Sequence, residues 1–252
     1  GPWSPGTPRA RLARRPVRAA VLGPGGVTSL DYSQETPMLF AELADRLVSQ
    51  VGRPAQAGDV YLAQGGSLMG DEPAIRALLA EVVVPQVPLA ISAANLWIGS
   101  GGNVSYLHFD PMENVLAMLC GRKKLVLIPP DQTHHVYPIY DPDPLGSATD
   151  LRRPDFAKHP GLHLATYSEV VLEAGEALFI PLGWWHHVAS EGLNIAVNVW
   201  WYPRHVRWLL NAPMRGLFLS QLTSRQGLKR LLKVKWKALR QLCSFAPMRR
   251  YA

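Results

Sequence analysis

The chain has 252 residues, 48% of them hydrophobic and 18% charged, which is typical of a globular protein with a sizeable core. Its two cysteines, Cys120 and Cys243, exclude a disulfide framework and a cysteine-based zinc site. No apolar run approaches the roughly 18 residues of a membrane span, and the apolar stretch of a secretory signal is missing. We therefore expect an intracellular protein, in the cytoplasm or the nucleus.

The net charge of +7 is unevenly distributed along the chain. Residues 1–26 carry five arginines and residues 204–252 carry twelve lysines and arginines, so all 19 acidic residues lie between them. Such basic ends indicate either solvated segments or an electrostatic surface for nucleic acid or anionic lipid. Residues 1–26 are also rich in Pro and Gly, and we expect an arm without helix or strand. Its arginines are compatible with organelle targeting.

Helical patterns precede a long region with the pattern of β-strands. Residues 36–50 predict an amphipathic helix capped by Thr36, with Pro37 in its first turn. A strand is expected over 59–64 and a second helix over 72–85. The expected apolar side of the first helix comprises Met38, Leu39, Ala41, Leu43, Leu47 and Val48.

From residue 93 to 202, short strands alternate with Gly-containing turns, which indicates a β-sandwich or barrel. The turns are expected at 99–103, 120–123, 173–176 and 190–194. The strands are expected at 95–99, 105–109, 114–121, 123–130, 169–181, 185–190 and 193–202. Residues 131–168 form a long insertion with little pattern, in a position from which it could cover a site.

A candidate metal site arises from the strand that contains His108 and Asp110. Residues i and i+2 of a strand share a face, so these two side chains project together, with Phe109 on the other side. A distant histidine, His186, completes the set of two imidazoles and one carboxylate found in non-haem Fe(II) oxygenases. Each histidine alone is more often a core residue, and the pairs His134/His135 and His159/His163 have the pattern of surface loops.

The combination of several motifs is more specific than any one of them. These motifs are YLAQ (61–64), NLWIGSGGNVSYLHFD (95–110), KKLVLIPPDQ (123–132), RRPDF (152–156), LFIPLGWWHHV (178–188) and NVWW (198–201). On these motifs the chain resembles the JmjC, or cupin-like, 2-oxoglutarate-dependent Fe(II) oxygenases, and among them the asparaginyl hydroxylases that act on hypoxia-inducible factor. The resemblance implies a mainly β fold with flanking helices, a double-stranded β-helix (jelly roll), and a C-terminal helical segment.

The resemblance also assigns roles to individual residues. It implies that His108, Asp110 and His186 bind Fe(II), while His187 points away. Lys123 is expected to bind the distal carboxylate of 2-oxoglutarate, with Lys124 on the opposite face. The other co-substrate contacts carried over are Ser105 and Tyr61 at the same carboxylate, Asn114 and Asn198 lining the pocket, and Trp200 as its wall.

The function implied is an Fe(II)- and 2-oxoglutarate-dependent dioxygenase that uses O₂ to hydroxylate a C–H bond of a protein or peptide side chain, with demethylation as a weaker expectation. The positions near Leu145 and Gly146 lack the polar side chains that clamp the target amide in asparaginyl hydroxylases, so the asparagine substrate does not carry over. Three alternatives stay open. They are a tRNA-base hydroxylase favoured by the basic ends, a non-catalytic cupin-like interaction module, and a cupin with another metal, in which Lys123 would have no purpose.

Three segments are therefore expected: the arm 1–26, a catalytic domain 27–203 and a basic helical segment 204–252. The helical pattern of the last segment is interrupted at Pro213, and an apolar stripe from Leu228 to Cys243 follows. Isolated helices are marginal in water, so this stripe must be buried. The resemblance implies a homodimer through these C-terminal helices. Packing on the same subunit and binding to a membrane surface are the alternatives.

Overall fold

The computed structural model describes residues 12–28, 35–63, 93–139, 145–202 and 211–223. The strands are β1 (Pro16–Val21), β2 (Val27–Thr28), β3 (Glu35–Leu39), β4 (Val60–Tyr61), β5 (Ala93–Gly99), β6 (Val104–Phe109), β7 (Glu113–Ile128), β8 (Ser168–Glu173), β9 (Ala177–Ile180) and β10 (Trp185–Trp201). The helices are α2 (Phe40–Gln50) and α4 (Ala212–Thr223), with 3-10 turns η1 (Pro24–Gly26), η2 (Pro130–His135) and η3 (Pro160–Leu164). The helix expected over 72–85 and the Leu228–Cys243 stripe lie outside the described residues.

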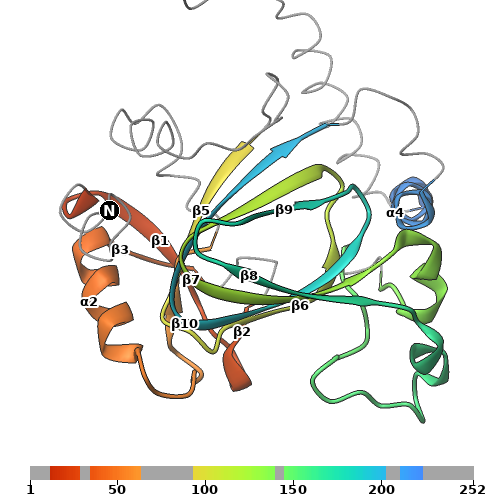
Figure 1. The fold of residues 1–252 in the computed structure, drawn as a ribbon, viewed down its shortest axis with the longest axis horizontal. Coiled ribbons are helices and arrows are strands. Elements are labelled where there is room, and N and C mark those ends of the chain that lie inside the picture. The colour runs from red at the N-terminus through yellow and green to blue at the C-terminus, as the bar shows by residue number, and fades with distance from the viewer. Residues whose placement is uncertain (1–11, 29–34, 64–92, 140–144, 203–210, 224–252) are drawn as a thin grey trace, which may run out of the picture.

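Two long strands, β7 and β10, each contribute to both walls of a barrel (Figure 1). Residues 185–191 of β10 pair with β6 and with residues 122–128 of β7, to which β8 adds a further strand. Residues 195–201 of β10 pair with β5 and with residues 113–120 of β7, to which β9 is added. Two facing antiparallel sheets result, which confirms the predicted double-stranded β-helix.

The bends between the two walls lie where the sequence analysis expected chain-reversing turns. The register between β10 and β7 shifts between Glu191 and Ile195, and Gly121 and Gly192 have φ of 73° and 59°. The prediction of separate strands at 114–121 and 123–130, and at 185–190 and 193–202, is therefore wrong. Glycine permits the left-handed backbone that bends a strand without ending it. The turns at 99–103 and 173–176 do separate strands, as expected.

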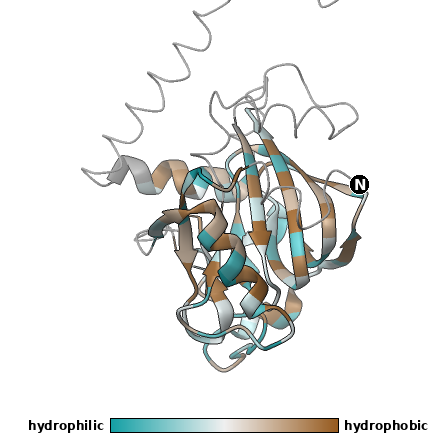
Figure 2. Ribbon diagram, turned by 90° about the vertical axis from the view of Figure 1, so that its left-hand side faces the viewer, coloured by the Kyte–Doolittle hydropathy of each residue, from teal (hydrophilic) through white to brown (hydrophobic). Residues whose placement is uncertain are grey.

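The space between the sheets is filled by alternate residues of the long strands, as the period of two requires. Leu116, Met118, Leu125 and Leu127 of β7 are buried there together with Ile180 of β9. Figure 2 shows the resulting change between hydrophobic and hydrophilic residues along the strands. This packing forms the core between the two sheets.

Residues 12–26, the described part of the arm predicted over 1–26, contain regular structure. Residues 16–21 form β1, which pairs antiparallel with β3 and β4. Leu12 and Val17 are buried in a core cluster shared with the barrel strands β5 and β10. β1 alternates exposed and buried residues, with Arg18 exposed beside Glu35. The surrounding arginines, prolines and glycines concealed this short alternation in the sequence. The expectation of no regular structure is therefore wrong for these residues.

The predicted helix over 36–50 begins later than expected. Residues 35–39 form strand β3, so Thr36 and Pro37 lie in that strand, and α2 starts at Phe40. Its buried face consists of Phe40, Leu43, Leu47 and Gln50. Leu39 and Val48, expected on the apolar side, are 51% and 65% exposed. Pairing with β1 determined the conformation of residues 35–39, which outweighed the local helix-start signal.

The insertion after β7 reaches the open end of the barrel. The backbone N–H of Phe109 donates to the carbonyl of Leu145 at 3.1 Å, and that of Ser147 donates to Leu107 at 2.9 Å, so residues 145–147 extend along β6. Helix α4 contains Pro213 in its first turn, a position that tolerates proline. Among the described residues, no helix is long and apolar enough to cross a bilayer.

Candidate functional site

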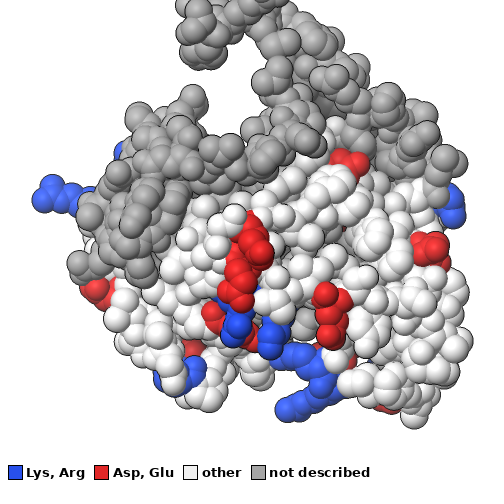
Figure 3. Space-filling view, in the orientation of Figure 1, with Lys and Arg blue, Asp and Glu red and all other residues white. Residues whose placement is uncertain are grey.

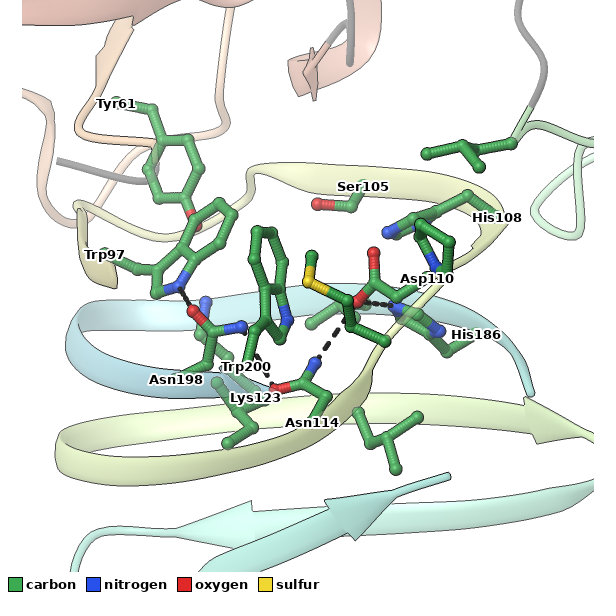
Figure 4. A pocket seen from close by; sticks show the side chains of 16 residues that line it. Tyr61, Trp97, Ser105, His108, Asp110, Asn114, Lys123, His186, Asn198 and Trp200 are labelled. Atoms are coloured by element: carbon green, nitrogen blue, oxygen red, sulfur yellow. Dashed lines mark hydrogen bonds and ion pairs between the residues drawn. The ribbon is translucent and has the colours of Figure 1, made fainter. Parts of the chain in front are cut away.

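The open end of the barrel contains a cavity of about 230 Å³ between the two sheets (Figure 4). Its walls come from β4, β5, β6, β7, β9 and β10 and from the insertion. The structure brings together every residue predicted for the site: Tyr61, Ser105, His108, Asp110, Asn114, Lys123, His186, Asn198 and Trp200. Segments as far apart as Tyr61 and Trp200 therefore meet in one pocket.

His108, Asp110 and His186 converge at one end of this cavity. His186 lies directly opposite His108 in the pairing of β10 with β6, and their ring centroids are 4.1 Å apart. Asp110 follows β6, with its Oδ2 atom 3.7 Å from Nε2 of His186. One potential ligand atom from each side chain lies within 4.8 Å of the others, so the group could hold a metal ion. His187 does not line the cavity.

Backbone carbonyls determine which nitrogen of each imidazole is free. Nδ1 of His108 lies 2.7 Å from the carbonyl oxygen of Tyr106, and Nδ1 of His186 lies 3.0 Å from that of Trp184. A carbonyl only accepts, so each Nδ1 carries the proton and each Nε2 presents a lone pair. Burial, reinforced by neighbouring His186, holds the pKa of His108 well below its usual value. Neutral imidazole is the form that binds metals.

The Asp110 carboxylate is buried beside an amide donor. Burial raises the pKa of Asp110, whereas nearby His186 and a hydrogen bond from Asn114 lower it. Nδ2 of Asn114 donates to Oδ2 of Asp110 at 3.3 Å. An isolated buried carboxylate is costly, so this site favours a cation that neutralises it.

Lys123 supplies a buried positive charge at the other end of the cavity. The Lys123 side chain is nearly inaccessible to solvent, and burial lowers its pKa to about 7. Its Nζ donates to Oγ of Ser190 at 2.6 Å. Its Nζ also lies 5.8 Å from the ring centroid of Tyr61. Lys124 points outward and forms an ion pair with Glu191 at 2.7 Å. Strand alternation predicted this difference between the two lysines.

The pocket amides are oriented by a chain of hydrogen bonds. Oδ1 of Asn198 accepts from Nε1 of Trp97 at 2.8 Å and from Nδ2 of Asn95 at 3.0 Å. Nδ2 of Asn198 then donates to Oδ1 of Asn114 at 3.0 Å. Both amide oxygens accept from protein donors, and each amide nitrogen uses one of its two N–H groups within the protein, so the second N–H of each amide is left to meet a ligand. The pocket thus favours a ligand rich in acceptors, such as a carboxylate.

Sequence reasoning missed several residues of this site. Asn95 and Trp97 share a face of β5, which the i, i+2 rule could have revealed once Asn198 was assigned to the pocket. Ser190 lies opposite Lys123 in the register of β10 with β7. That register is a long-range property, and no local signal gives it. The resemblance pointed instead to Ser105, which lines the cavity without being the recorded partner of Lys123.

The jelly-roll fold with two histidines and a carboxylate at its open end defines a cupin-type protein with a candidate metal centre. The family described as cupin-like domain matches residues 16–206, which is more than half of the chain. The chain therefore belongs to the JmjC-type, cupin-like family of 2-oxoglutarate oxygenases, whose members in general depend on Fe(II) and 2-oxoglutarate. The match begins at β1, which agrees with the buried position of that strand.

Several curated proteins are similar to this chain. Lysine-specific demethylase JMJ31 of Arabidopsis thaliana is 35% identical over 178 residues, which cover 66% of this chain and 32% of that protein. Lysine-specific demethylase 8 of Danio rerio is 42% identical over 109 residues, 42% of this chain and 27% of that protein. The human tRNA wybutosine-synthesizing protein 5 is 36% identical over 104 residues, 41% of this chain and 32% of that protein.

The chain thus spans about a third or less of the length of these relatives. Two of them are named as demethylases, an activity that the sequence analysis ranked below hydroxylation. The likeness to asparaginyl hydroxylases in particular stays a prediction.

Proposed function

We propose that this protein is an Fe(II)- and 2-oxoglutarate-dependent dioxygenase that hydroxylates a C–H bond of a protein or peptide side chain. One observation carries the proposal: a cluster of two histidines and one aspartate shares its cavity with a buried lysine. A non-catalytic module has no need to bury an ammonium group against its desolvation cost. A cupin that performs isomerisation would likewise have no use for Lys123.

The donor set fits Fe(II). His108 and His186 would contribute Nε2, the nitrogen that their backbone partners leave free, and Asp110 would contribute a carboxylate oxygen. Two imidazoles and one carboxylate are characteristic of non-haem Fe(II) oxygenases, which need coordination positions for co-substrate and O₂. The buried carboxylate supports the assignment, because a cation would neutralise it.

The rest of the cavity fits 2-oxoglutarate. Its volume of about 230 Å³ is below the roughly 300–1,000 Å³ of pockets for drug-sized ligands, so it suits a small diacid. Lys123 would bind the distal carboxylate through a charge-assisted hydrogen bond, next to the hydroxyl groups of Ser190 and Ser105. The N–H groups of Asn114 and Asn198 and the indole of Trp200 would face the bound acid.

Fe(II) with 2-oxoglutarate supplies an oxidation in which O₂ is consumed, the keto acid becomes succinate and CO₂, and a C–H bond becomes C–OH. The residues of this chain would orient the co-substrate and exclude water from the cavity. Leu116, Ile180 and Val188 line the cavity with apolar surface, which strengthens the attraction between Lys123 and a carboxylate. Leu145 of the insertion and Met112 lie among the other lining residues.

A protein or peptide is the substrate class that we propose first. On the face in Figure 3, the basic side chains at the lower centre lie next to acidic ones. Arg122 and Lys124, for example, both pair with Glu191. A nucleic-acid surface typically presents basic groups that are free to contact phosphates. Similarity to proteins named as lysine-specific demethylases also supports this class.

A tRNA base is the second candidate substrate. Its support is the similarity to tRNA wybutosine-synthesizing protein 5, which is 38% identical in Gallus gallus and 36% identical in Homo sapiens. The basic terminal segments, most of which lie outside the described residues, also favour it. Binding through phosphates would weaken steeply with added salt.

Turnover tests the proposal. The protein with Fe(II), ascorbate and 2-oxoglutarate is incubated with peptide and tRNA pools, and succinate and a mass gain of one oxygen on the substrate are measured. An N-methyl substrate instead loses its methyl group as formaldehyde, which identifies demethylation. Absence of succinate with every pool, from a protein shown to bind Fe(II) and 2-oxoglutarate, would favour the non-catalytic module.

A further inference from the structure

The hydrogen-bonded amides of the pocket connect strand β5 to a residue of the proposed metal centre. Trp97 of β5 donates to Asn198 of β10, Asn198 donates to Asn114 of β7, and Asn114 donates to Asp110 (Figure 4). Asn95 of β5 is a second donor to Asn198. We call Asn95, Asn198 and Asn114 the amide chain. Asn95, Asn114 and Asn198 are each at most 5% exposed.

The direction of the amide chain follows from its first donor. An indole N–H can donate and cannot accept, so the group of Asn198 that faces Trp97 must be its oxygen. The nitrogen of Asn198 must then face Asn114, which in turn presents its oxygen to Asn198 and its nitrogen to Asp110. If Asn114 were reversed, its oxygen would face the carboxylate of Asp110, and two acceptors would repel one another. The orientation of the amides is thus set from both ends of the chain, by the indole donor of β5 and by the acceptor oxygens of Asp110.

We propose that Asn95 and Trp97 are positioning residues for Asp110. Through the amide chain they keep an N–H directed at Oδ2 of Asp110, which helps to orient the carboxylate toward the two histidines. The inference rests on the proposed function, because it requires Asp110 to bind a metal. Groups that orient metal ligands in this way typically change metal affinity by about 10–100-fold when they are lost.

The two donors back each other up, which gives the proposal a distinctive signature. Either Trp97 or Asn95 alone still supplies a hydrogen to Oδ1 of Asn198, so the direction of the chain survives the loss of one donor. Loss of both leaves the buried Oδ1 of Asn198 without a donor, so Asn198 is no longer held in place and Asn114 loses its fixed partner. The effect of the double substitution should therefore exceed the product of the two single effects.

The test measures Co(II) binding by the whole chain without co-substrate, for Trp97→Phe, Asn95→Leu and the double variant. We expect the dissociation constant to rise less than threefold in each single variant and about tenfold or more in the double variant. The visible absorption bands of bound Co(II), which report ligand geometry, should change in the saturated double variant. A purely structural role of the two residues would lower the thermal midpoint without changing these bands.

Trp185→Phe is the matched control. Trp185 is fully buried and also donates one indole hydrogen bond, at 3.1 Å to Thr133, on the other face of its strand from His186. The Trp185→Phe variant should lose about as much stability as the Trp97 and Asn95 variants. It should keep the Co(II) affinity and the Co(II) absorption bands of the unsubstituted protein. If the double variant does not fold, Asn198→Leu interrupts the same chain and replaces it in the test, with the same expected result.

Co(II) affinity of the double variant, or of its replacement, within threefold of the unsubstituted protein would overturn the inference and leave the proposed function intact. Failure of the unsubstituted protein to bind Co(II) would overturn the metal centre and the inference with it. The two results are therefore distinguishable in one experiment.

Discussion

Lys123 and Ser190 lie opposite one another on β7 and β10, and the 2.6 Å bond from Nζ to Oγ is the only hydrogen bond of this ammonium that the structure records among the described residues. An ammonium group carries three donors, so the bond to Ser190 leaves most of its capacity unused. A buried cation without a counter-ion is unfavourable. Burial lowers the pKa of Lys123 to about 7, and a carboxylate bound beside it would counteract this shift.

Lys123→Ala should weaken 2-oxoglutarate binding far more than Lys124→Ala. Removing one partner of a buried charge pair costs about 3–5 kcal/mol, whereas an exposed pair such as Lys124 with Glu191 contributes about 0–1 kcal/mol. Calorimetric titration of 2-oxoglutarate into the Co(II)-loaded variants measures the difference. Equal effects of the two substitutions would show that Lys123 does not bind the co-substrate.

The affinity for 2-oxoglutarate should depend on pH through Lys123. The pKa of this lysine is about 7 in the free protein, and a bound carboxylate raises it. Below pH 7 the lysine is already protonated, so affinity is constant. Above it, binding requires proton uptake, and affinity falls by up to about tenfold per pH unit. Lys123→Arg, whose guanidinium stays charged, should give a flatter profile. An unchanged profile in that variant would assign the pH dependence to another group.

His186→Ala should abolish tight metal binding, while His187→Ala should not. His186 faces His108 and Asp110, and its loss removes a ligand, so Co(II) affinity should fall by more than the roughly 10–100-fold typical of outer-shell partners. His187 lies on the other face of β10 and outside the cavity. Thermal unfolding identifies any loss of stability in the control. Loss of metal affinity in His187→Ala with an unchanged melting midpoint would contradict the assignment.

Gly121→Ala should destabilise the fold more than Gly175→Ala. Both glycines have positive φ, 73° and 92°, so alanine costs about 1–2 kcal/mol at either position through backbone strain. At Gly121 the added Cβ would also collide with the carbonyl oxygen of Leu193 at the bend of β10, whereas nothing lies within 4 Å at Gly175. Such overpacking adds about 1–3 kcal/mol. Urea unfolding gives both values, and equal losses would mean that the bend adjusts to the methyl group.

Features that depend on local period could be predicted from the sequence alone. Alternation along a strand placed His108 with Asp110 and separated Lys123 from Lys124, and both placements agree with the structure. Gly-containing turns between short apolar runs indicated the β class of the fold. Local period failed where pairing outweighed propensity: residues 35–39 joined β1 as a strand, and the bends at Gly121 and Gly192 continued strands that were expected to end.

Which distant residues meet depends on the pairing of strands in the folded barrel. The register of β10 sets His186 opposite His108 and Ser190 opposite Lys123, and the pairing of β10 with β5 brings Asn198 beside Asn95. A shift of one residue in any of these pairings would turn each side chain to the other face of its sheet. Register depends on the packing of both sheets and on where the long strands bend. The alternation of a strand can be predicted from its local sequence. The partner of each residue on the neighbouring strand is set by the register of the closed barrel.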